Sequence, residues 1–567
     1  MGWNDAAKRP PERWLGAFGE ALARYDAQAV AGLFADECYW RDLVAFTWNI
    51  RTCEGRGEIQ AMLGATLRAT RPAMLTIGNH TETEGWFTFE TAVGRGTGHL
   101  RLTGGKCFTL LTTLQELKGF EERRSTGTEK RSENPYVVIV GGGQGGIALA
   151  ARLQRLGVPA VVLEKNERAG DSWRKRYKAL VLHDPVWYDH LPYIPFPAHW
   201  PVFSPKDRMA DWLEAYVRAM DIDYRGSSPV TSAKYDEAAK EWSVSYQDGA
   251  AGRVLKARHL VLATGMSGVP HLPRIPGADF KGRMLHSSRY GGGEAWRGKK
   301  CVVVGSGTSA HDICLDLVGN GADVTMVQRA PSIVVRTESL MELAWGPLYS
   351  EKAVASGIST ELADLTTASV PFKILPGRQK PIYDQIAKRD ADLYKGLAKA
   401  GFQYDFGVDG SGIHALYLRR GAGYYIEVGA SKAIIEGRIK LKNASVERID
   451  ERSLVLSDGS ELPADLVVFA TGYGSMNGWA AQLISQEVAD KVGKVWGLGS
   501  DTKNDPGPWV GELRNMWKPT LQPGLWFHGG NLMQSRHYSR YLALQLKARM
   551  ENIPTPVFRI DAVHHKE

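Results

Sequence analysis

Over the first 120 residues, the spacing of apolar positions switches between that of helices and that of strands. Apolar side chains recur at helical intervals from Leu15 to Phe34, and a second predicted helix opens at Gly55. Strand-like segments surround the second helix, at 38–43, 73–77, 86–91, 98–103 and 106–114. This order predicts an α+β unit over residues 1–120, and the polar, charged residues 121–134 after it predict a linker.

The spacing changes at Tyr136, where five strand-forming residues run into glycines and the glycines run into a helix-forming stretch. The glycines stand at the spacing G-x-G-x-x-G, as Gly141, Gly143 and Gly146. In a dinucleotide-binding fold the first allows a tight turn, the second lets a pyrophosphate approach, and the third lets helix and strand pack closely. The helix then presents free N–H groups and its positive dipole end to the phosphates.

A second strand, 160–163, follows that helix and ends at Glu164, roughly 20 residues after the glycines, where a carboxylate accepts the ribose hydroxyls. A glycine-rich turn without a ligand is the alternative interpretation, but strand, glycines, helix, strand and acid all fall in order. The sequence therefore predicts the first part of a dinucleotide-binding domain over residues 135–291.

The same pattern returns in residues 300–329 with a different end. The strand 300–304 enters a second glycine motif, formed by Gly305, Gly307 and Ala310, and the next strand ends at Arg329. An arginine there fits a 2′-phosphate rather than a free ribose diol, although a surface salt bridge is the alternative. The strand that faces the ribose therefore ends in an acid, Glu164, in the first unit and in a base, Arg329, in the second. This difference predicts two different sites, one for FAD or NAD and one for NADP.

Each glycine motif is followed by a strand that ends in Ala-Thr-Gly, at 263–265 and at 470–472. Two such turns are what an inserted domain needs at its two crossovers. We therefore predict an α/β fold with two Rossmann-like dinucleotide-binding domains, one inserted in the other, plus the N-terminal α+β unit. The NAD(P)H-binding domain covers 292–474 with a lid insertion, and 475–567 returns to the first domain.

Composition narrows the class of protein. With 43% hydrophobic residues and a net charge of +8, the chain reads as an ordinary soluble protein with anionic nucleotide ligands. No dense Lys/Arg stripe indicates nucleic acid, and no apolar run indicates a membrane span. The five cysteines are scattered and odd in number, which predicts a reducing compartment and no metal site. Without a signal-like N-terminus, a cytoplasmic location is expected.

Residues between the two glycine units carry a family resemblance. Phe280, Gly282, His286 and Tyr290 match the fingerprint F-x-G-x-x-x-H-x-x-x-(Y/F) of flavin-containing monooxygenases. With both glycine motifs and Phe-Ala-Thr-Gly-Tyr at 469–473, residues 135 to about 550 resemble this class B flavoprotein monooxygenase family.

The first 120 residues resemble a nuclear-transport-factor-2 or SnoaL-like cone, as in the longer type of the family. Such cones hold a ligand or serve as dimerisation surfaces, so a homodimer is one arrangement to expect. One hypothesis for this unit is that Asp42 or His80 acts as a general acid or base. The favoured hypothesis is that the unit is a non-catalytic module.

The resemblance implies an FAD-dependent monooxygenase that uses NADPH, with NADH as an alternative, and O2. Hydride passes from nicotinamide to flavin, oxygen adds as a C4a-hydroperoxide, and one oxygen atom enters a small organic substrate. N/S-oxygenation and Baeyer–Villiger oxidation of a ketone both stay open. The implied cofactor-binding residues are Gly141, Gly143, Gln144, Gly145, Gly146, Glu164, Lys165, Ser172, Trp173, Gly305, Gly307, Thr308, Ser309, Ala310, Arg329, Thr471, Gly472 and Asn531.

The candidate catalytic residues are His183, Asp184 and Tyr290. Many family members carry Thr-Ser-Asn near the flavin, where this chain has Leu182-His183-Asp184. A neutral His183 could donate a hydrogen bond to a substrate carbonyl, with Asp184 holding its tautomer; the alternative is a turn cap before Pro185. His183 in place of the asparagine favours Baeyer–Villiger oxidation. Tyr290 does not favour it, because the Baeyer–Villiger subgroup usually has Trp at this position.

Two other classes compete with a monooxygenase. A disulfide or ferredoxin-type reductase would also have two dinucleotide sites, but a disulfide reductase needs a redox cysteine pair, and no close pair exists. A degenerate flavoprotein whose cone is the working binding module is the other class, and the intact glycines in both motifs argue against it.

Overall fold

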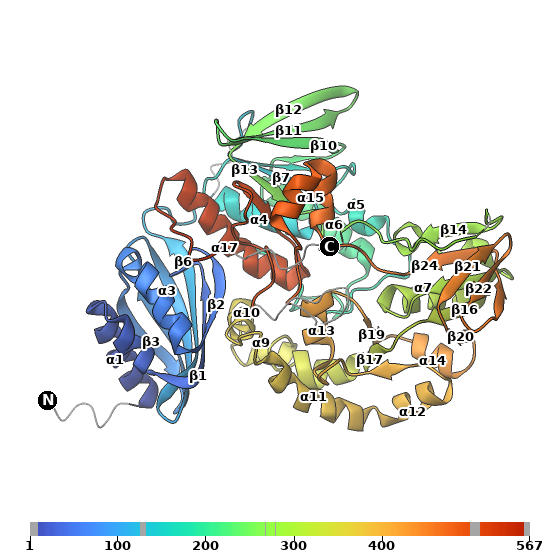
Figure 1. Cartoon of the computed structure of the whole chain (residues 1–567), viewed down its shortest axis with the longest axis horizontal. Helices are drawn as coiled ribbons and strands as arrows, with labels where there is room; N and C mark the ends of the chain where they lie inside the picture. The colour runs from blue at the N-terminus through green and yellow to red at the C-terminus, as the bar shows by residue number, and fades with distance from the viewer. Residues whose placement is uncertain (1–8, 125–131, 267, 278, 499–510, 561–567) are drawn as a thin grey trace.

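The computed structural model describes residues 9–124, 132–266, 268–277, 279–498 and 511–560 (Figure 1). Residues 125–131 of the predicted linker lie outside this part of the chain. No helix among the described residues is long and apolar enough to cross a membrane.

The N-terminal unit is a six-stranded sheet with helices against it. The sheet has the order β2-β1-β6-β5-β4-β3, and only β1 and β6 pair in parallel. Five of the strands were predicted; β2 was not, because its polar residues Arg51 and Thr52 interrupt the apolar run. The elements are α1 (Pro10–Ala23), α2 (Ala27–Gly32), β1 (Phe34–Leu43), β2 (Ile50–Glu54), α3 (Gly55–Thr70), β3 (Ala73–His80), β4 (Glu84–Glu90), β5 (Gly94–Thr103) and β6 (Lys106–Leu117).

Aromatic side chains occupy the interior of this unit. Trp14 stacks on Phe18 with ring centroids 4.7 Å apart. Asp42 lies beside them, 1% exposed, and its carboxylate accepts hydrogen bonds from the Thr47 and Thr112 hydroxyls at 2.7 and 2.6 Å. Burial raises the pKa of Asp42 to about 6, although these hydrogen bonds oppose the rise. The geometry therefore gives Asp42 a structural role and favours the non-catalytic interpretation of the unit.

The first dinucleotide unit is built on a parallel sheet with the order β25-β13-β7-β8-β9. Helices α4 and α17 pack on each other beside this sheet, and the C-terminal strand β25 pairs with β13, so the chain returns to this domain as predicted. A separate meander of β10 to β12 stands at the top of Figure 1. The elements are β7 (Val137–Val140), α4 (Gln144–Arg155), β8 (Ala160–Leu163), α5 (Asp171–Arg174), α6 (Lys206–Ala219), β9 (Tyr224–Arg225), β10 (Val230–Asp236), β11 (Glu241–Asp248), β12 (Ala251–Ala257), β13 (His259–Leu262), α15 (Asn477–Leu483), α16 (Gln486–Val492), β25 (Leu525–Phe527) and α17 (Leu532–Met550).

The second dinucleotide unit has the parallel order β14-β24-β15-β16-β20. The placement of β14 corrects the predicted boundary at 291, because β14 pairs with β24 and therefore belongs to the second sheet. Arg283 and Met284 are exposed on β14, so this strand lacks the continuous apolar run that marks the buried parallel strands in the sequence. The elements are β14 (Arg283–His286), η1 (Ser287–Arg289), η2 (Glu294–Trp296), β15 (Lys300–Val304), α7 (Thr308–Gly319), β16 (Asp323–Gln328), α14 (Ala430–Ile435), β20 (Ile439–Asn443), β21 (Val446–Asp450), β22 (Ser453–Leu456), β23 (Glu461–Pro463) and β24 (Leu466–Phe469).

The predicted lid is mainly helical and forms the lower edge of Figure 1. Two of its helices, α11 and α12, meet at Asp390, whose carboxylate accepts a hydrogen bond from Ser339 at 2.8 Å. The elements are β17 (Ser332–Arg336), α8 (Thr337–Leu340), η3 (Met341–Trp345), α9 (Glu351–Ala355), α10 (Thr360–Ala368), α11 (Leu375–Arg389), α12 (Ala391–Lys399), β18 (Tyr404–Asp405), α13 (Gly412–Arg420) and β19 (Tyr424–Glu427).

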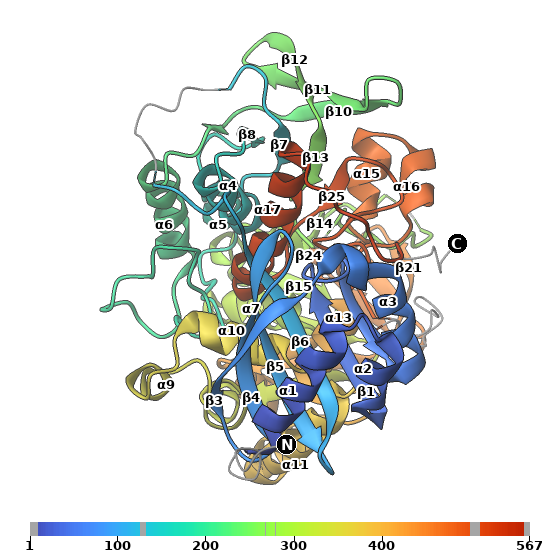
Figure 2. The same cartoon turned by 90° about the vertical axis from the view of Figure 1, so that its left-hand side faces the viewer.

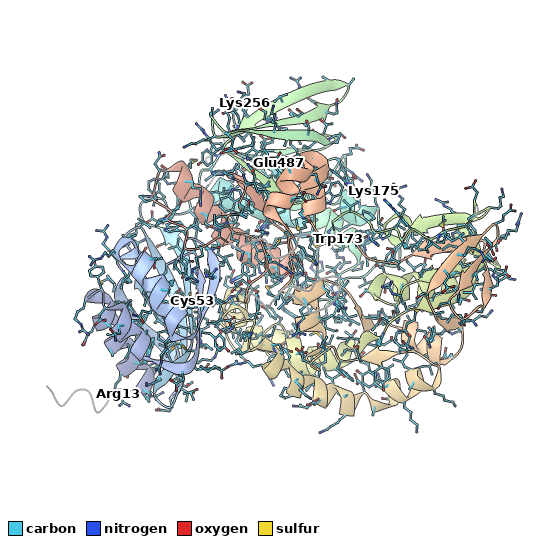
Figure 3. The ribbon with its side chains drawn as sticks, in the orientation of Figure 1. Arg13, Cys53, Trp173, Lys175, Lys256 and Glu487 are labelled. Carbon is cyan, nitrogen blue, oxygen red and sulfur yellow. The ribbon has the colours of Figure 1, made fainter. Side chains whose placement is uncertain are left out.

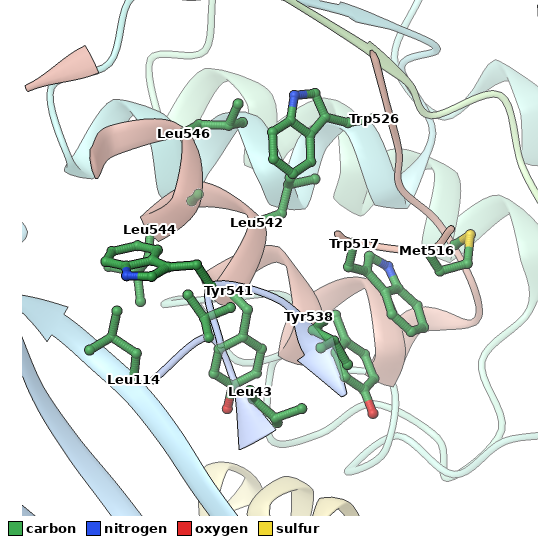
Figure 4. Packing of buried hydrophobic residues seen from close by; sticks show 14 of the residues in the cluster. Leu43, Leu114, Met516, Trp517, Trp526, Tyr538, Tyr541, Leu542, Leu544 and Leu546 are labelled. Carbon is green, nitrogen blue, oxygen red and sulfur yellow. The ribbon is translucent and has the colours of Figure 1, made fainter. Parts of the chain in front are cut away.

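The N-terminal sheet docks on the C-terminal helix α17 within the same chain (Figure 2). Leu43 and Leu114 from the sheet share one buried cluster with Tyr541 and Leu544 of α17 (Figure 4). On the same helix, Tyr538 stacks on Trp517 with ring centroids 3.9 Å apart. The two parts therefore have a common hydrophobic core.

Candidate active site

The three glycines of the first motif are needed for different reasons. Gly141 has φ +110°, and a Cβ there would lie 2.4 Å from the Ala263 carbonyl oxygen. A Cβ on Gly146 would lie 2.0 Å from the Gly141 carbonyl oxygen. At Gly143, which precedes α4, a Cβ would meet nothing within 4 Å. The outer glycines are thus required by packing, whereas the space over Gly143 at the helix N-terminus fits a pyrophosphate.

Glu164 lies beside this loop at the end of β8. One carboxylate oxygen accepts a hydrogen bond from the Gly142 amide at 2.7 Å, and the other accepts from the Asn166 amide at 2.9 Å. The side chain is held where the ribose of a dinucleotide on this loop would reach it. The sequence prediction for Glu164 is consistent with this position.

Buried polar atoms near the first glycine loop lack partners within the described residues. These are both ring nitrogens of His528 and the hydroxyls of Thr264 and Ser535. A Cβ on Gly145 would lie 3.4 Å from the His528 ring and 3.7 Å from the Ser535 hydroxyl. Groups of this kind suit a polar ligand, and so the cradle fits FAD. Sequence reasoning noted the Gly-Gly-Asn turn after β25 but missed His528 and Ser535 themselves.

The second glycine motif repeats the first. Gly305 has φ +128°, and a Cβ there would lie 2.4 Å from the Ala470 carbonyl oxygen, in the second Ala-Thr-Gly turn. At Gly307 the nearest atom to a Cβ would be the Tyr424 carbonyl oxygen at 3.9 Å. The Thr308 hydroxyl donates to this same oxygen at 2.8 Å and fixes the start of α7. The open N-terminus of α7, which also carries Ser309 and Ala310, fits the pyrophosphate of NADPH.

Arg329 is exposed at the end of β16, directly after the buried Gln328. Its side chain makes no ion pair or hydrogen bond with the part of the chain that the structure describes. The alternative of a surface salt bridge is therefore not observed, and the guanidinium is open to a 2′-phosphate.

Replacing Arg329 with glutamine is expected to weaken NADPH binding by about 1.5–3 kcal/mol, since one charge-assisted hydrogen bond is lost. Binding of NADH, which lacks the 2′-phosphate, is expected to stay nearly unchanged. Titration of both coenzymes against wild type and variant measures this difference. Equal losses for the two coenzymes would exclude Arg329 from the phosphate site.

His183 and Asp184 lie in the loop between α5 and α6. The His183 ring is 30% exposed and meets Tyr424 edge-on, with ring centroids 6.1 Å apart. Its Nε2 lies 4.0 Å from the Asp184 carboxylate, which is too far for a hydrogen bond. Burial raises the pKa of Asp184, although His183 opposes the rise. The expected tautomer-holding hydrogen bond is therefore not observed, and the part-exposed imidazole lies beside Tyr424 of the lid.

Aromatic and amide side chains gather at the N-terminus of α17. Asn531 caps this helix by accepting from the Gln534 amide at 2.9 Å, and its side chain donates to the Tyr188 hydroxyl at 2.9 Å. The Tyr417 hydroxyl of α13 donates to the Gln534 side chain at 3.2 Å. The first domain, the lid and the C-terminal helix therefore meet here, and a role of Asn531 in cofactor binding stays a prediction.

Tyr290 does not lie with this group. It is 2% exposed in the core of the second unit, and its hydroxyl donates to the Asp316 carboxylate of α7 at 2.7 Å. A hydroxyl bound in this way cannot contact a substrate, so the prediction that Tyr290 is catalytic is wrong. The fingerprint matched because it encodes packing.

His286 of the same fingerprint also has a structural place. Its Nε2 bonds the Gly472 carbonyl oxygen at 3.0 Å, and the Thr471 hydroxyl donates to the His271 carbonyl oxygen at 2.6 Å. These contacts join the second Ala-Thr-Gly turn to the segment that enters the second domain. Thr471 and Gly472 thus lie at the crossover between the two domains, where both cofactors would approach each other.

Three candidates for FAD binding remain, namely Lys165, Ser172 and Trp173. Trp173 of α5 is half-buried near the middle of the molecule in Figure 3, and Ser172 before it is exposed. The Lys165 ammonium lies 5.8 Å from the centre of the Trp479 ring. A role in FAD binding for these three residues stays a prediction.

Comparison with known proteins extends this picture. Residues 138–353 match the family model described as pyridine nucleotide-disulphide oxidoreductase. Indole-3-pyruvate monooxygenase YUCCA1 of Oryza sativa subsp. japonica is 33% identical over 381 residues, which cover 66% of this chain and 85% of the rice protein. Probable indole-3-pyruvate monooxygenase YUCCA10 of Arabidopsis thaliana is 31% identical over 344 residues, covering 60% and 82%.

The solved structure of OTEMO in complex with FAD and NADP has the same fold. Its TM-score is 0.51 at 19% identity, and the match covers 74% of this chain and 85% of OTEMO. Fold and glycine loops together define a flavoprotein with two dinucleotide-binding domains. The five cysteines are all buried and free, so the chemistry of a disulfide reductase has no cysteine pair here.

The chain belongs to the flavin-containing monooxygenase family, a group of class B flavoprotein monooxygenases. It is an FAD-dependent enzyme that uses NADPH and O2 to oxygenate a small organic substrate. When bound, NADPH supplies the hydride and FAD supplies the oxygen-activating chemistry. The side chains described above are the candidates to bind, orient and shield these groups.

Proposed function

We propose that this monooxygenase acts on the carbonyl group of an aromatic 2-oxo acid. The observation that carries the proposal is the His183 imidazole, which is 30% exposed beside Tyr424 of the lid and has no hydrogen-bond partner among the described residues. From this position one ring N–H can donate to a carbonyl oxygen and increase the electrophilicity of the carbonyl carbon. The relatives named as indole-3-pyruvate monooxygenases support the substrate class.

Buried aromatic side chains cluster behind the His183 loop, and the part-buried Tyr417 and Tyr424 offer the surface for such a substrate. Tyr188 lies 4.8 Å from Tyr349 and 6.3 Å from Trp345, measured between ring centroids. Tyr417 and Tyr424 come from the lid next to them. An indole or phenyl ring packs well on tyrosine and tryptophan rings, whereas an aliphatic chain would gain less.

The overall reaction balances without another co-reactant. One 2-oxo acid, O2, NADPH and a proton give the acid with one carbon fewer, CO2, water and NADP⁺. The bond between the keto carbon and the carboxyl carbon breaks, and one oxygen atom of O2 enters the new carboxyl group. NADPH provides the two electrons that reduce the other oxygen atom to water.

An amine is the second candidate, and a specific observation favours it. Asp189 is 1% exposed, and neither of its carboxylate oxygens has a hydrogen-bond partner among the described residues. It follows Tyr188 directly, and a cationic nitrogen would compensate its buried charge. Substrate-dependent NADPH oxidation with phenylpyruvate, an aromatic amine and a cyclic ketone distinguishes the candidates. Release of CO2 from phenylpyruvate is expected, and turnover of the amine alone would overturn the proposal.

Replacing His183 with alanine is expected to lower product yield per NADPH roughly 100-fold, which is a common loss for one donor to a developing oxyanion. Electrons from NADPH should instead appear as hydrogen peroxide. The His183→Gln variant keeps an N–H donor and should recover part of the yield. Unchanged yield in His183→Ala would return this residue to a turn-capping role.

A further inference from the structure

The loop that carries His183, Asp184 and Tyr188 is held from behind by one buried arginine of α17. Arg536 donates through Nη1 to the backbone carbonyl oxygen of Tyr188 at 2.8 Å and also to that of His190. The arginine is 3% exposed. Because both acceptors are main-chain atoms, these bonds fix the path of the loop and therefore the direction of its side chains.

The other edge of this guanidinium is bound to the lid. Arg536 Nε and Nη2 donate to the two carboxylate oxygens of Asp364 at 2.9 and 2.7 Å. Asp364 lies on α10 and is also 3% exposed. The planar fork of arginine suits this bidentate contact, and lysine could not make it while also reaching the loop.

Helix α10 is in turn held by the N-terminal domain. Arg41 of β1 donates to the carbonyl oxygen of Ala368 at 2.8 Å, and Arg101 of β5 donates to that of Ser369 at 2.8 Å. Arg101 also donates to the Ser369 hydroxyl at 2.7 Å. Two cations thus meet the last carbonyls of the helix, where the helix dipole favours positive charge. The N-terminal sheet therefore fixes the helix that carries Asp364.

We propose that Arg536 is a positioning residue for the oxygenation site and that the N-terminal domain is its anchor, through Arg41, Arg101, α10 and Asp364. This domain then acts on catalysis from a distance without binding a ligand of its own. It holds the His183 loop closed over the reduced cofactor, so that O2 reduction ends in product rather than in free hydrogen peroxide. The inference rests on the proposed role of the His183 loop and not on the identity of the substrate.

The direct test is backbone hydrogen exchange of residues 183–191 in the full-length protein. Arg536→Lys keeps the charge but loses the fork, and the amides of this loop should exchange at least about tenfold faster than in wild type. Arg101→Met removes one contact between the N-terminal domain and α10. It should give a smaller increase in hydrogen exchange in the same loop. Arg95→Met is the matched control, since Arg95 lies on the same β5 strand but pairs with the exposed Glu116.

The functional arm needs no organic substrate. Anaerobic reduction of bound FAD by NADPH should stay within about twofold of wild type in all variants, because both glycine loops are untouched. In air, NADPH, a proton and O2 give NADP⁺ and hydrogen peroxide, and this leak should rise severalfold in Arg536→Lys and less in Arg101→Met. Arg95→Met should match wild type.

Three outcomes overturn the proposal. Loop exchange and leak equal to wild type in Arg536→Lys would show that this arginine only stabilises the fold. A greater leak without faster loop exchange would show that it acts by another route. If Arg101→Met behaved like wild type, the N-terminal domain would have no part in positioning the loop. The Arg101→Met variant also tests the proposal if Arg536→Lys does not fold. Failure of phenylpyruvate as a substrate would affect none of these results.

Discussion

Replacing Gly143 with valine is expected to give a folded protein that no longer retains FAD. A Cβ at Gly143 meets nothing within 4 Å, so the chain itself tolerates the side chain. The branched methyls would fill the space into which the pyrophosphate must come to reach the N–H groups of α4. Loss of two charge-assisted hydrogen bonds, at about 1.5 kcal/mol or more each, weakens FAD binding at least about 100-fold.

Gly307 of the second motif provides the reciprocal control, since a Cβ there would have its nearest neighbour at 3.9 Å. Gly307→Val should remain yellow but should not be reduced by NADPH. The absorbance of FAD in the purified proteins and its bleaching by NADPH without oxygen measure both effects. Stoichiometric FAD in Gly143→Val would refute the assignment of the first loop.

Sequence reasoning found these two loops because local rules govern them. Strand, glycine turn, helix and charged strand end all fall within about 30 residues, and each glycine has its own steric cause. The structure shows the same steric pattern at Gly141 and Gly305, where a Cβ would meet the carbonyl oxygen of Ala263 or Ala470. The two Ala-Thr-Gly turns were therefore a sound signal for two related domains.

The contacts behind the site could not be read in this way. Arg536 and Asp364 are 172 residues apart, and Arg41 and Glu512 are 471 residues apart. Charged residues are read by default as surface residues, since they are seldom fully buried unless paired. Nothing in one sequence shows which of its 70 basic and 62 acidic residues pair inside. The prediction for Tyr290 was wrong for a different reason. Its match to the family fingerprint was taken to mean that the side chain lies in the active site.

Replacing Arg41 with methionine is expected to cause a large loss of stability. Arg41 is fully buried between the N-terminal sheet and the rest of the molecule, and its guanidinium lies 4.3 Å from the centre of the Phe372 ring. Its Nε and Nη2 donate to the two carboxylate oxygens of Glu512 at 2.7 and 2.9 Å. Burial disfavours the cation, but Glu512 and Tyr538 together more than offset this effect and raise the pKa of Arg41.

Methionine fills most of the volume but leaves the Glu512 carboxylate, 4% exposed, without its cation. Removing one partner of a buried pair costs about 3–5 kcal/mol, which corresponds to a thermal midpoint lower by roughly 3–4 °C for a chain of this length. Thermal unfolding followed by the release of FAD fluorescence measures this change.

The expected loss of stability comes from breaking the Arg41–Glu512 ion pair, and not from the loss of the arginine alone. Adding Glu512→Gln to Arg41→Met removes the uncompensated charge while keeping a donor and acceptor for Thr52, whose hydroxyl donates to Glu512 at 2.8 Å. The double variant should therefore regain much of the lost midpoint, and Arg95→Met should change it little, because its partners are exposed. If the double variant were as unstable as the sum of the two single variants, the ion pair would not be what joins the N-terminal sheet to the segment around Glu512.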